Sequence, residues 1–263
     1  MVHKLTKELR MKLLAADYDG TLRRGDTVSQ RNKEALINWR KQGNLFGIVT
    51  GRSLESIQKE IIKNELAIDF LITNNGGVQA DGNGNVLSVT TIDFNAALEI
   101  IDYIRSLNCI SYVLNNGISR SRTVLKASAE DLKYGNQDVM RSEADLIAEG
   151  QIAQIVISVE DNEINHEYAK AINERFSAYV EAFPNLYCVD IVPKGISKAE
   201  GINKMLIDSK LEPVSVLCVG DQFNDCSMLQ AYKGYTFHDS PQELQSMAFK
   251  VIDEVADVVD DEL

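Results

Sequence analysis

The chain has 263 residues, of which 44% are hydrophobic, so it is long enough to bury one large core or two modest ones. Its formal net charge of -12 argues against binding to nucleic acid or to an anionic membrane surface, because both repel a protein without a basic patch. Its longest apolar runs are far shorter than the roughly 20 residues of a membrane-spanning helix.

The first ten residues and the cysteines indicate a cytoplasmic protein. Residues 1–10 (MVHKLTKELR) carry positive charges that no apolar core follows before the first strand, which is not the pattern of a signal peptide. The cysteines lie far apart and form no C-x-x-C pair, so we expect reduced thiols rather than disulfides or a zinc site. They are Cys109, Cys188, Cys218 and Cys226.

The most informative stretch is Leu13–Leu22, which reads LLAADYDGTL. Its apolar part has the pattern of a buried strand, and Asp17 and Asp19 leave the end of that strand on the same side, because side chains alternate along a strand. Two carboxylates this close are stable when a cation lies between them or when one keeps its proton. Mg²⁺ takes oxygen ligands, and a protonated carboxyl can act as a general acid. The alternative is a polar turn ending at Gly20.

A helix and a second buried strand are expected next. The helix is predicted to begin after Ser29, a plausible N-cap, and to end at Gln42. Trp39 is expected to face the sheet as a core residue rather than to stack on a ligand. The strand is predicted at Leu45–Val49.

The second strand is followed by a possible anion site. Thr50 and Gly51 come directly after it, and Ser53 is a candidate N-cap of a helix that runs to about Asn64. Free backbone amides and the helix dipole favour a phosphate at such a position. Turn chemistry explains Thr50 and Gly51 equally well when they are considered by themselves.

After a third strand at Ile68–Thr73 the alternation of strands and helices gives way to a mixed pattern. This pattern predicts an inserted α+β domain of residues 81–189 within a Rossmann-like parallel α/β core of residues 1–80 and 190–263. The polar segment Lys126–Gly150 is expected to be a mobile or helical surface segment. The elements expected in the insertion are a hairpin around residues 81–85, helices at Asn95–Ser106 and Asn165–Tyr179, and strands at Ile110–Leu114, Ala153–Val159 and Leu186–Val192.

The α/β pattern resumes at Pro193 with a helix that carries a cation at its start. Ser197 and Glu200 have the spacing of a capping box, which places Lys198 at the first helical position. A cation there opposes the helix dipole unless an anion lies nearby. Lys198 is therefore a modest indication of an anion site, and Lys194 is a weaker candidate for the same role.

A fourth strand at Val214–Val219 ends in the sequence GDQFND. Asp221 leaves its strand end much as Asp17 does, and Asp225 lies four residues further, near the start of another helix. Either acid could simply cap that helix. A short last strand is expected at Tyr235–Phe237, and the chain closes with the acidic sequence ADVVDDEL. Because so few residues follow ADVV, we expect the final helix to be missing.

These polar residues are predicted to meet at one edge of the sheet. Open parallel sheets place their sites at the carboxyl ends of the strands, and Asp17, Thr50 and Asp221 each follow such an end. Lys198 lies on the helix that leads to the last of these strands. Any one of these features can arise by chance, but the whole set in this order would rarely do so.

With these motifs in this order, the sequence resembles the phosphatases of the haloacid dehalogenase (HAD) superfamily. More narrowly, it resembles the Cof-type sugar-phosphatase branch with a class IIB cap, a large α+β domain inserted between the second and third motifs. The matching motifs are DYDGTL, VTG, the lysine of GISK, and GDQFND. The cap itself matches in layout and not in sequence.

The resemblance implies a Mg²⁺-dependent phosphatase that hydrolyses a small phosphorylated metabolite, such as a sugar phosphate, through an aspartyl-phosphate intermediate. Asp17 would be the nucleophile and Asp19 the general acid and base. Asn224 would orient Lys198 or the phosphate. The full set of implied site residues is Asp17, Asp19, Asp221 and Asp225 for the metal, and Thr50, Gly51, Lys198 and Asn224 for the phosphate.

Two other functions remain open at this point. One is a phosphomutase of the same superfamily, and the other is a catalytically idle regulatory or binding protein. A dehalogenase is disfavoured by Asp19, because halide needs no protonated leaving group. Substrate selectivity would come from the cap, and neither its selective residues nor the oligomeric state can be inferred from the pattern. His238 is expected to be a solvated loop residue, and ordinary packing is favoured for four polar cap residues: Tyr112, Asn115, Asn116 and Arg120.

Overall fold

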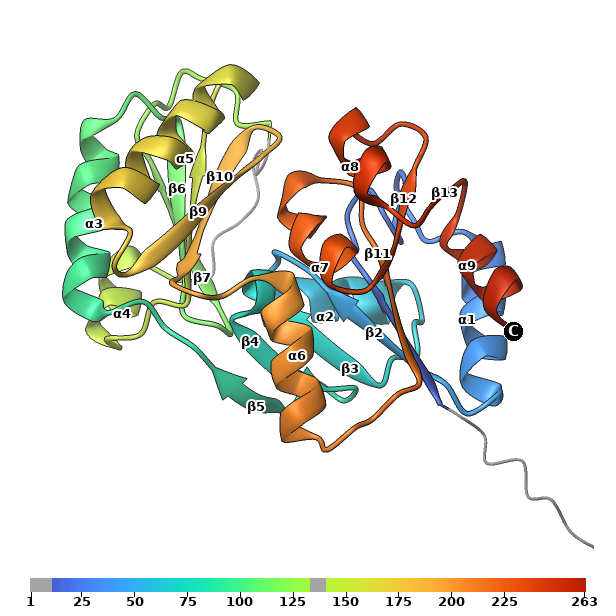
Figure 1. Cartoon of the computed structure of the whole chain (residues 1–263). Helices are drawn as coiled ribbons and strands as arrows, with labels where there is room; N and C mark the ends of the chain where they lie inside the picture. Colours follow the sequence, from blue (N-terminus) through green and yellow to red (C-terminus); the bar gives the residue numbers. More distant parts are fainter. Residues whose placement is uncertain (1–10, 133–140) are drawn as a thin grey trace, which may run out of the picture.

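The computed structural model describes residues 11–132 and 141–263, which form two β-sheets with helices packed against them (Figure 1). Residues 1–10, considered above for a signal peptide, and residues 133–140 of the polar segment lie outside the described residues. Within the described ranges, no helix has both the length and the hydrophobicity needed to cross a bilayer.

The larger sheet has eight strands in the order β13-β12-β11-β1-β2-β3-β4-β5. Neighbours from β13 to β3 pair in parallel, and β4 and β5 extend the sheet in antiparallel fashion. The α/β fold with a largely parallel sheet is thus confirmed. The strands are β1 (Lys12–Ala16), β2 (Leu45–Val49), β3 (Phe70–Thr73), β4 (Val78–Asp81), β5 (Val86–Val89), β11 (Ser215–Val219), β12 (Lys233–Phe237) and β13 (Lys250–Ile252).

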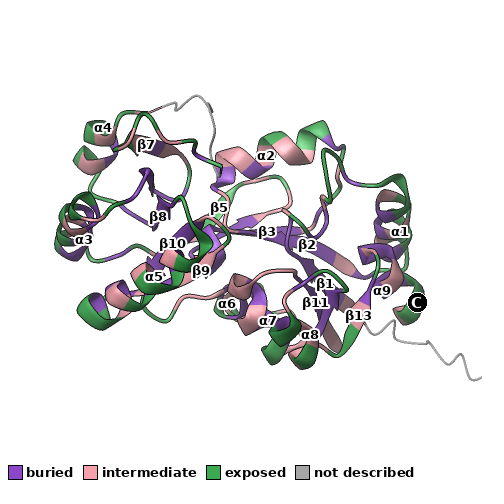
Figure 2. Ribbon diagram, turned by 90° about the horizontal axis from the view of Figure 1, so that it is seen from above, coloured by how far each residue is buried: buried purple, intermediate pink, exposed green. Residues whose placement is uncertain are grey.

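Both faces of the parallel part are covered by helices, which is why β1 and β2 are almost continuously apolar. In Figure 2 the buried strands run between α1 and α2 on one side and α6 and α7 on the other. Trp39 is fully buried in the first of these layers, as predicted. The helices of this unit are α1 (Gln30–Lys41), α2 (Leu54–Lys63), α6 (Lys198–Asp208), α7 (Cys226–Ala231), α8 (Gln242–Met247) and α9 (Val255–Glu262).

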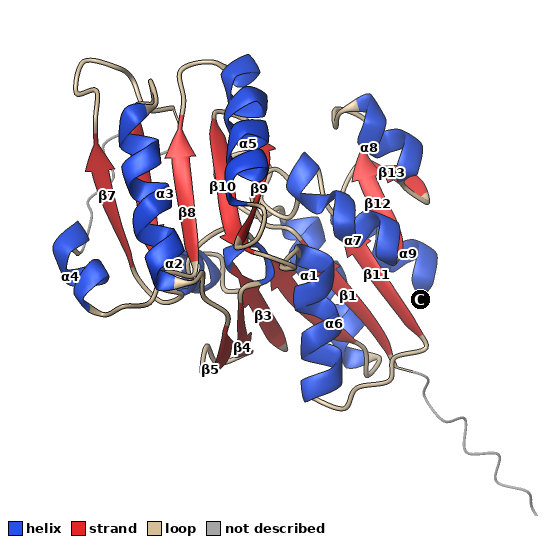
Figure 3. Ribbon diagram, turned by 60° about the vertical axis from the view of Figure 1, so that its left-hand side comes forward, coloured by secondary structure: helices blue, strands red, loops and turns tan. Residues whose placement is uncertain are grey.

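The smaller sheet is antiparallel and has the order β7-β6-β8-β10-β9. Helices α3 and α5 pack on one of its faces through a continuous apolar cluster, and Figure 3 shows them in front of the strands. We call the following elements the smaller unit: α3 (Phe94–Ser106), β6 (Ser111–Asn115), β7 (Arg120–Val124), α4 (Glu143–Ala148), β8 (Gln154–Ser158), α5 (Asn162–Phe176), β9 (Val180–Asn185) and β10 (Cys188–Pro193).

The structure differs from the predicted elements in several places. The hairpin around residues 81–85 joins β4 to β5 at the edge of the larger sheet, although the sequence analysis assigned it to the insertion. Strands β7, β9 and β13 were not predicted, and the prediction that Tyr235–Phe237 is the last strand is wrong, because β13 follows it and pairs with β12. Strand prediction depends on alternating apolar residues. The turn before β4 has little of this alternation, and the sequence of β7 is polar and partly exposed.

The prediction that the final helix is missing is wrong, because α9 packs against α1. The backbone N–H of Ala256 donates to Asn32 Oδ1 at 2.8 Å, and Val255, Val258 and Val259 lie in the core cluster. The sequence ADVVDDEL supplies just enough apolar residues at helical spacing to bury one face.

The last turn of α9 gives a testable pH dependence. Glu262 accepts hydrogen bonds from Lys233 Nζ at 2.5 Å, Lys12 Nζ at 2.9 Å and the Tyr235 hydroxyl at 2.9 Å. Burial by itself would raise the pKa of Glu262, but these bonds outweigh it and lower the pKa to about 2. The unfolded chain therefore binds this proton more tightly, so the contribution to stability is present above the ordinary pKa of about 4.3 and is lost as the pH falls towards 2.

We expect Glu262→Gln to lower the free energy of unfolding by about 1–3 kcal/mol at pH 7, because it removes hydrogen bonds to a charged acceptor. The difference from the unsubstituted chain should shrink between pH 5 and pH 2. Urea unfolding at a series of pH values measures it, with the exposed Glu212→Gln as the matched control. A difference that stays constant with pH would attribute the effect to packing instead.

Candidate active site

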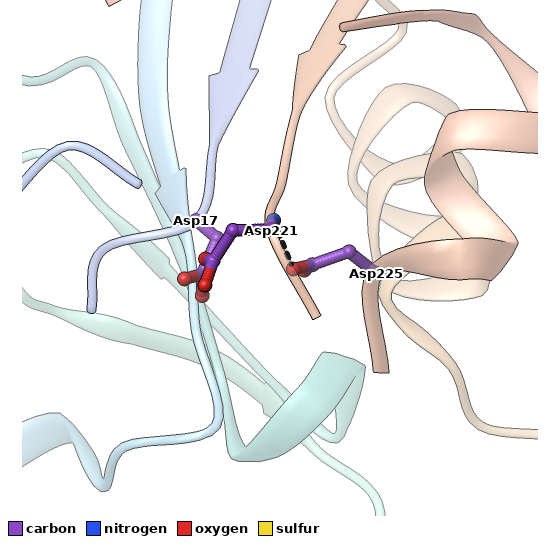
Figure 4. Close-up of side chains that lie close together, drawn as sticks. All are labelled: Asp17, Asp221 and Asp225. Atoms are coloured by element: carbon purple, nitrogen blue, oxygen red, sulfur yellow. Dashed lines mark hydrogen bonds between the residues drawn. The ribbon is translucent and has the colours of Figure 1, made fainter. Parts of the chain in front are cut away.

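The ends of β1 and β11 bring three carboxylates together. These strands are parallel neighbours with Ala16 opposite Val219, so the residues that follow them emerge side by side. One carboxylate oxygen from each of Asp17, Asp221 and Asp225 lies within 4.8 Å of the other two. Figure 4 shows the carboxyl groups of Asp17 and Asp221 next to each other, with Asp225 directed towards the backbone amide of Asp221.

Lys198 joins this cluster from the first turn of α6. Ser197 caps the helix by accepting from the Glu200 N–H at 3.2 Å, so Lys198 is the first helical residue, as predicted. Its Nζ lies 2.6 Å from Asp17 Oδ1 and 2.5 Å from Asp225 Oδ1, and the side chain is 0% exposed. The two carboxylates supply the anion that a cation at a helix N-terminus requires.

A close backbone contact holds the start of α6 in this position. Gly76, at a φ of +113°, lies so near the Ser197 carbonyl that a Cβ would be 2.1 Å from its oxygen. A larger residue could not be accommodated without moving the helix, and the positive φ itself disfavours other residues. Gly76 therefore helps to place Lys198.

The cluster has more negative charge than Lys198 can neutralise. Burial raises the pKa of Asp17 well above its usual value, and the carboxylates of Asp225 and Asp221 add to the rise while Lys198 opposes it. Burial and Asp225 likewise raise the pKa of Asp221 to about 6. Burial would lower the pKa of Lys198, but the two carboxylates outweigh it and raise this pKa, so the lysine stays charged.

Asp221 and Asp225 have different surroundings. Asp225 Oδ2 accepts from the backbone N–H groups of Asp221 and Gln222 at 2.9 and 3.0 Å, while Oδ1 accepts from Lys198. Both oxygens are thus already engaged. Asp221 accepts from the Thr21 hydroxyl at 2.6 Å. Gly20 lets this carboxylate approach, because a Cβ there would be 2.4 Å from Asp221 Oδ2.

Asp19 is held apart from the other acids by two arginines. Arg52 Nε donates to Asp19 Oδ2 at 2.5 Å, a second Arg52 nitrogen donates to Oδ1 at 2.8 Å, and Arg23 also donates to Oδ1. Burial would raise the pKa of Asp19, but these arginines outweigh it and lower the pKa to about 2. In this arrangement Asp19 is a carboxylate and can accept a proton, and it must leave the arginines before it can act as an acid.

A cavity of about 290 Å³ lies over these residues, between the larger sheet and the smaller unit. Its floor includes Asp17, Asp19, Thr50, Gly51 and Asn224. Its other wall comes from β6, β7, β8 and β10 and from the end of β9. The volume lies near the lower end of the roughly 300–1,000 Å³ that is usual for small-molecule pockets.

The remaining candidates lie in different places. Asn224 lines the cavity, and its side-chain Nδ2 donates to Asn75 Oδ1 at 3.0 Å. Lys194 pairs with Glu181 on β9, 2.7 Å away, and His238 is 71% exposed beside Asp253. Of the polar cap residues, Asn115 and Arg120 line the cavity, whereas Tyr112 is packed in the core of the smaller unit and Asn116 bonds to Glu149.

Two residues that were not predicted, Arg52 and Asn75, shape the floor of the cavity. Arg52 follows Thr50 and Gly51 directly, and its position after a strand end was the signal that could have found it. Asn75, at a φ of +53°, lies against Gly51: a Cβ on Gly51 would be 3.2 Å from its amide. The Asn75 backbone N–H also donates to the Thr50 carbonyl at 3.0 Å, so it supports the loop that carries both cavity residues.

The donor set fits a hard divalent cation. Carboxylate oxygens are the ligands that Mg²⁺ prefers, and three of them lie within 4.8 Å of one another here. Burial, together with the neighbouring carboxylates, raises the pKa values of Asp17 and Asp221, and a cation beside these groups would lower both values. Because both oxygens of Asp225 are engaged, Asp17 and Asp221 are the better candidates for direct ligands.

The family follows from a comparison with known proteins. The sequence model for haloacid dehalogenase-like hydrolases matches residues 14–259, which includes both sheets and every residue of the cluster. The chain belongs to this family. The resemblance to the haloacid dehalogenase superfamily that the four motifs indicated is therefore confirmed.

Relatives of this HAD-like hydrolase include phosphatases. The stress response protein YhaX of Bacillus subtilis is 28% identical, with 83% of this chain and 80% of that protein covered. The 5-amino-6-(5-phospho-D-ribitylamino)uracil phosphatase YwtE of the same organism is 25% identical, with 84% and 85% covered. The solved HAD subclass IIB sugar phosphatase BT4131 has a TM-score of 0.78 at 20% identity, covering 95% of this chain and 98% of that one, which shows a shared fold. The present chain is a HAD-type phosphatase, a phosphoric monoester hydrolase.

Proposed function

We propose that this HAD-type phosphatase depends on Mg²⁺ and hydrolyses a small phosphorylated metabolite, a sugar phosphate in particular, through an aspartyl-phosphate intermediate. The observation that carries the proposal is the position of Asp17 at the floor of a cavity of about 290 Å³, with its carboxylate 2.6 Å from Lys198 Nζ and within 4.8 Å of an Asp221 carboxylate oxygen. This arrangement offers a nucleophile, a fixed positive charge and a cation site in one small space.

In the proposed reaction, an oxygen of Asp17 attacks phosphorus, and the bond from phosphorus to the ester oxygen breaks. Lys198 holds the Asp17 carboxylate in position and contributes positive charge beside the phosphoryl group. Thr50 and the Gly51 backbone, which line the cavity floor, bind phosphoryl oxygens. Asn224 faces the same space and can donate to the phosphate.

Asp19 donates a proton to the leaving oxygen in the first step and accepts one from the hydrolytic water in the second. The carboxylate form held by Arg52 and Arg23 suits the second step. For the first step, Asp19 must leave its arginine partners and take up a proton from solvent, which it then passes to the leaving oxygen. A phosphate entering the cavity competes with Asp19 for Arg52 and so favours this exchange.

The carboxylates of Asp17 and Asp221 and the backbone carbonyl of Asp19 would hold Mg²⁺, with Asp225 supporting them through its bonds to the Asp221 amide and Lys198. When bound, the ion would neutralise charge on the carboxylates and on the phosphoryl oxygens. In the same proposal, the smaller unit acts as the cap that selects the leaving group, and the four cysteine thiols fit a reducing, cytoplasmic setting.

The test is phosphate release from a panel of phosphorylated metabolites and from p-nitrophenyl phosphate. We expect hydrolysis with Mg²⁺ and a fall of at least about 100-fold in kcat after chelation by EDTA, because the cation contributes several kcal/mol to the transition state. Hydrolysis that is unchanged in EDTA would contradict the metal dependence. Formation of an isomeric sugar phosphate, rather than free phosphate, would favour a phosphomutase.

A binding measurement separates loss of the metal from loss of activity. Mg²⁺ is expected to raise the Tm of the unsubstituted chain, because it binds the folded state, and to have a much smaller effect on Asp221→Asn. Asp239→Asn is the matched control, since Asp239 lies on the exposed loop beside Arg24 and outside the cluster. Equal shifts of Tm in all three proteins would place the cation elsewhere.

A further inference from the structure

The face of the smaller sheet that looks onto the cavity carries polar side chains in register. On β8, Gln154 and Val156 face the cavity, whereas Ile155 and Ile157 point into the core under α3 and α5. Asp190 is paired with Val156 on the neighbouring strand and faces the same way. Strand alternation therefore gives this sheet an apolar face towards its helices and a partly polar face towards the cavity.

Gln154, Asp190 and Asn185 form one hydrogen-bond network on this face. Gln154 Nε2 donates to Asp190 Oδ1 at 3.1 Å, and Asn185 Nδ2 donates to Asp190 Oδ2 at 2.9 Å. Gln154 is 0% exposed and Asp190 is 3% exposed. These bonds fix the amide of Gln154 with its nitrogen towards Asp190, which leaves its carbonyl oxygen available on the other side.

The Gln154 Oε1 atom has no hydrogen-bond partner within the described residues, although it is buried. An unpaired buried acceptor costs about 1–3 kcal/mol, so such a group usually has a ligand or water as its partner. Gln154 lines the cavity, and its neighbour Asp190 is also an acceptor. A ligand that donates hydrogen bonds would therefore complement this side of the cavity.

We propose that Gln154, positioned by Asp190 and Asn185, binds hydroxyl groups of the leaving group and selects polyhydroxylated alcohols, that is, sugar and polyol phosphates. This inference rests on the proposed phosphatase function and specifies its substrate. Val113 and Val156 offer small apolar patches beside the acceptors, which suits the alternating C–H and O–H groups of a polyol.

The lining also argues against an aromatic leaving group. None of the described residues that line the cavity has an aromatic side chain, so a nucleobase or another flat ring would find no stacking partner. It would also leave the Gln154 acceptor unpaired, and sites built around such an acceptor discriminate strongly against ligands that cannot donate to it.

The test compares kcat/KM for aldose and alditol phosphates of three to six carbons with kcat/KM for p-nitrophenyl phosphate, whose leaving group has no other hydroxyl. For Gln154→Met, which keeps the length of the side chain but not its acceptor, we expect the ratio for the best polyol phosphate to fall about 10-fold or more. Asp190→Asn, which disturbs the position of Gln154, should lower the same ratio. Gln151→Met, at an exposed position three residues before Gln154, is the matched control and should leave the ratio unchanged.

Three results would overturn the inference. One is an unchanged ratio in both Gln154→Met and Asp190→Asn, which would reduce the network to a structural role. Another is a preference of the unsubstituted chain for nucleoside or aryl phosphates over every polyol phosphate. The third is failure to hydrolyse p-nitrophenyl phosphate with Mg²⁺, which would reject the proposed function itself and is thereby distinguishable from the first two.

Discussion

Replacing Asp17 by Asn is expected to lower kcat for p-nitrophenyl phosphate by about 10⁴-fold or more, since removal of a covalent nucleophile has effects of this order or larger. The amide cannot attack phosphorus, and it also weakens the bond that orients Lys198. The measurement is phosphate release at saturating substrate with Mg²⁺. Because the substitution is almost isosteric, the fold should persist.

A matched control and a direct assay for the intermediate make this result decisive. Asp26→Asn changes an exposed acid in the loop after the same motif and should leave kcat within about twofold. Acid quenching during turnover of a ³²P-labelled substrate should leave label on the unsubstituted chain and none on Asp17→Asn. Label retained by Asp17→Asn, or kcat within tenfold of the unsubstituted chain, would contradict the assignment of Asp17 as nucleophile.

Replacing Lys198 by Met is expected to affect both stability and catalysis. Lys198 is the buried cation between Asp17 and Asp225, so its removal leaves two carboxylates close together without compensation. Breaking a buried ion pair in this way costs about 3–5 kcal/mol in the free energy of unfolding. The loss of positive charge beside the phosphoryl group should lower kcat by about 10²–10³-fold. Urea unfolding in EDTA and phosphate release with Mg²⁺ measure the two effects.

The double variant Lys198→Met with Asp225→Asn distinguishes electrostatic from packing effects. Removing the second carboxylate's charge relieves the repulsion, so the double variant should be more stable than Lys198→Met by about 1 kcal/mol or more, while its activity stays low. Lys204→Met, on the exposed side of the same helix, serves as the matched control. A double variant less stable than the single one would show that the charge of Asp225 does not cause the instability.

Much of the core could be predicted because the signals are local. The sequence LLAADYD shows a short strand followed by polar residues. Parallel strands place their carboxyl ends together, so the proximity of Asp17 and Asp221 follows from the order of the elements. The N-caps Ser29, Ser53 and Ser197 are likewise short-range features, and all three side chains accept the predicted kind of backbone hydrogen bond.

The contacts that give these residues their chemical character could not be predicted. The sequence places Lys198 at the start of a helix near an anion, but it does not show that this lysine is fully buried on Asp17, a partner 181 positions away. Arg52 was passed over, although its bonds to Asp19 decide which protonation state that acid adopts. Both pairings depend on side chains from separate strands and helices meeting in space.

The sequence by itself determined the parallel core, the order of its motifs and the acids at the strand ends, because these depend on hydrophobic periodicity and on residues near one another in the chain. The tertiary structure decided the partners of Asp19 and Lys198, the place of the β4–β5 hairpin, the docking of α9 and the Gln154 network. Burial and hydrogen bonding are properties of surfaces in contact, and the contacting surfaces here come from segments far apart in the chain.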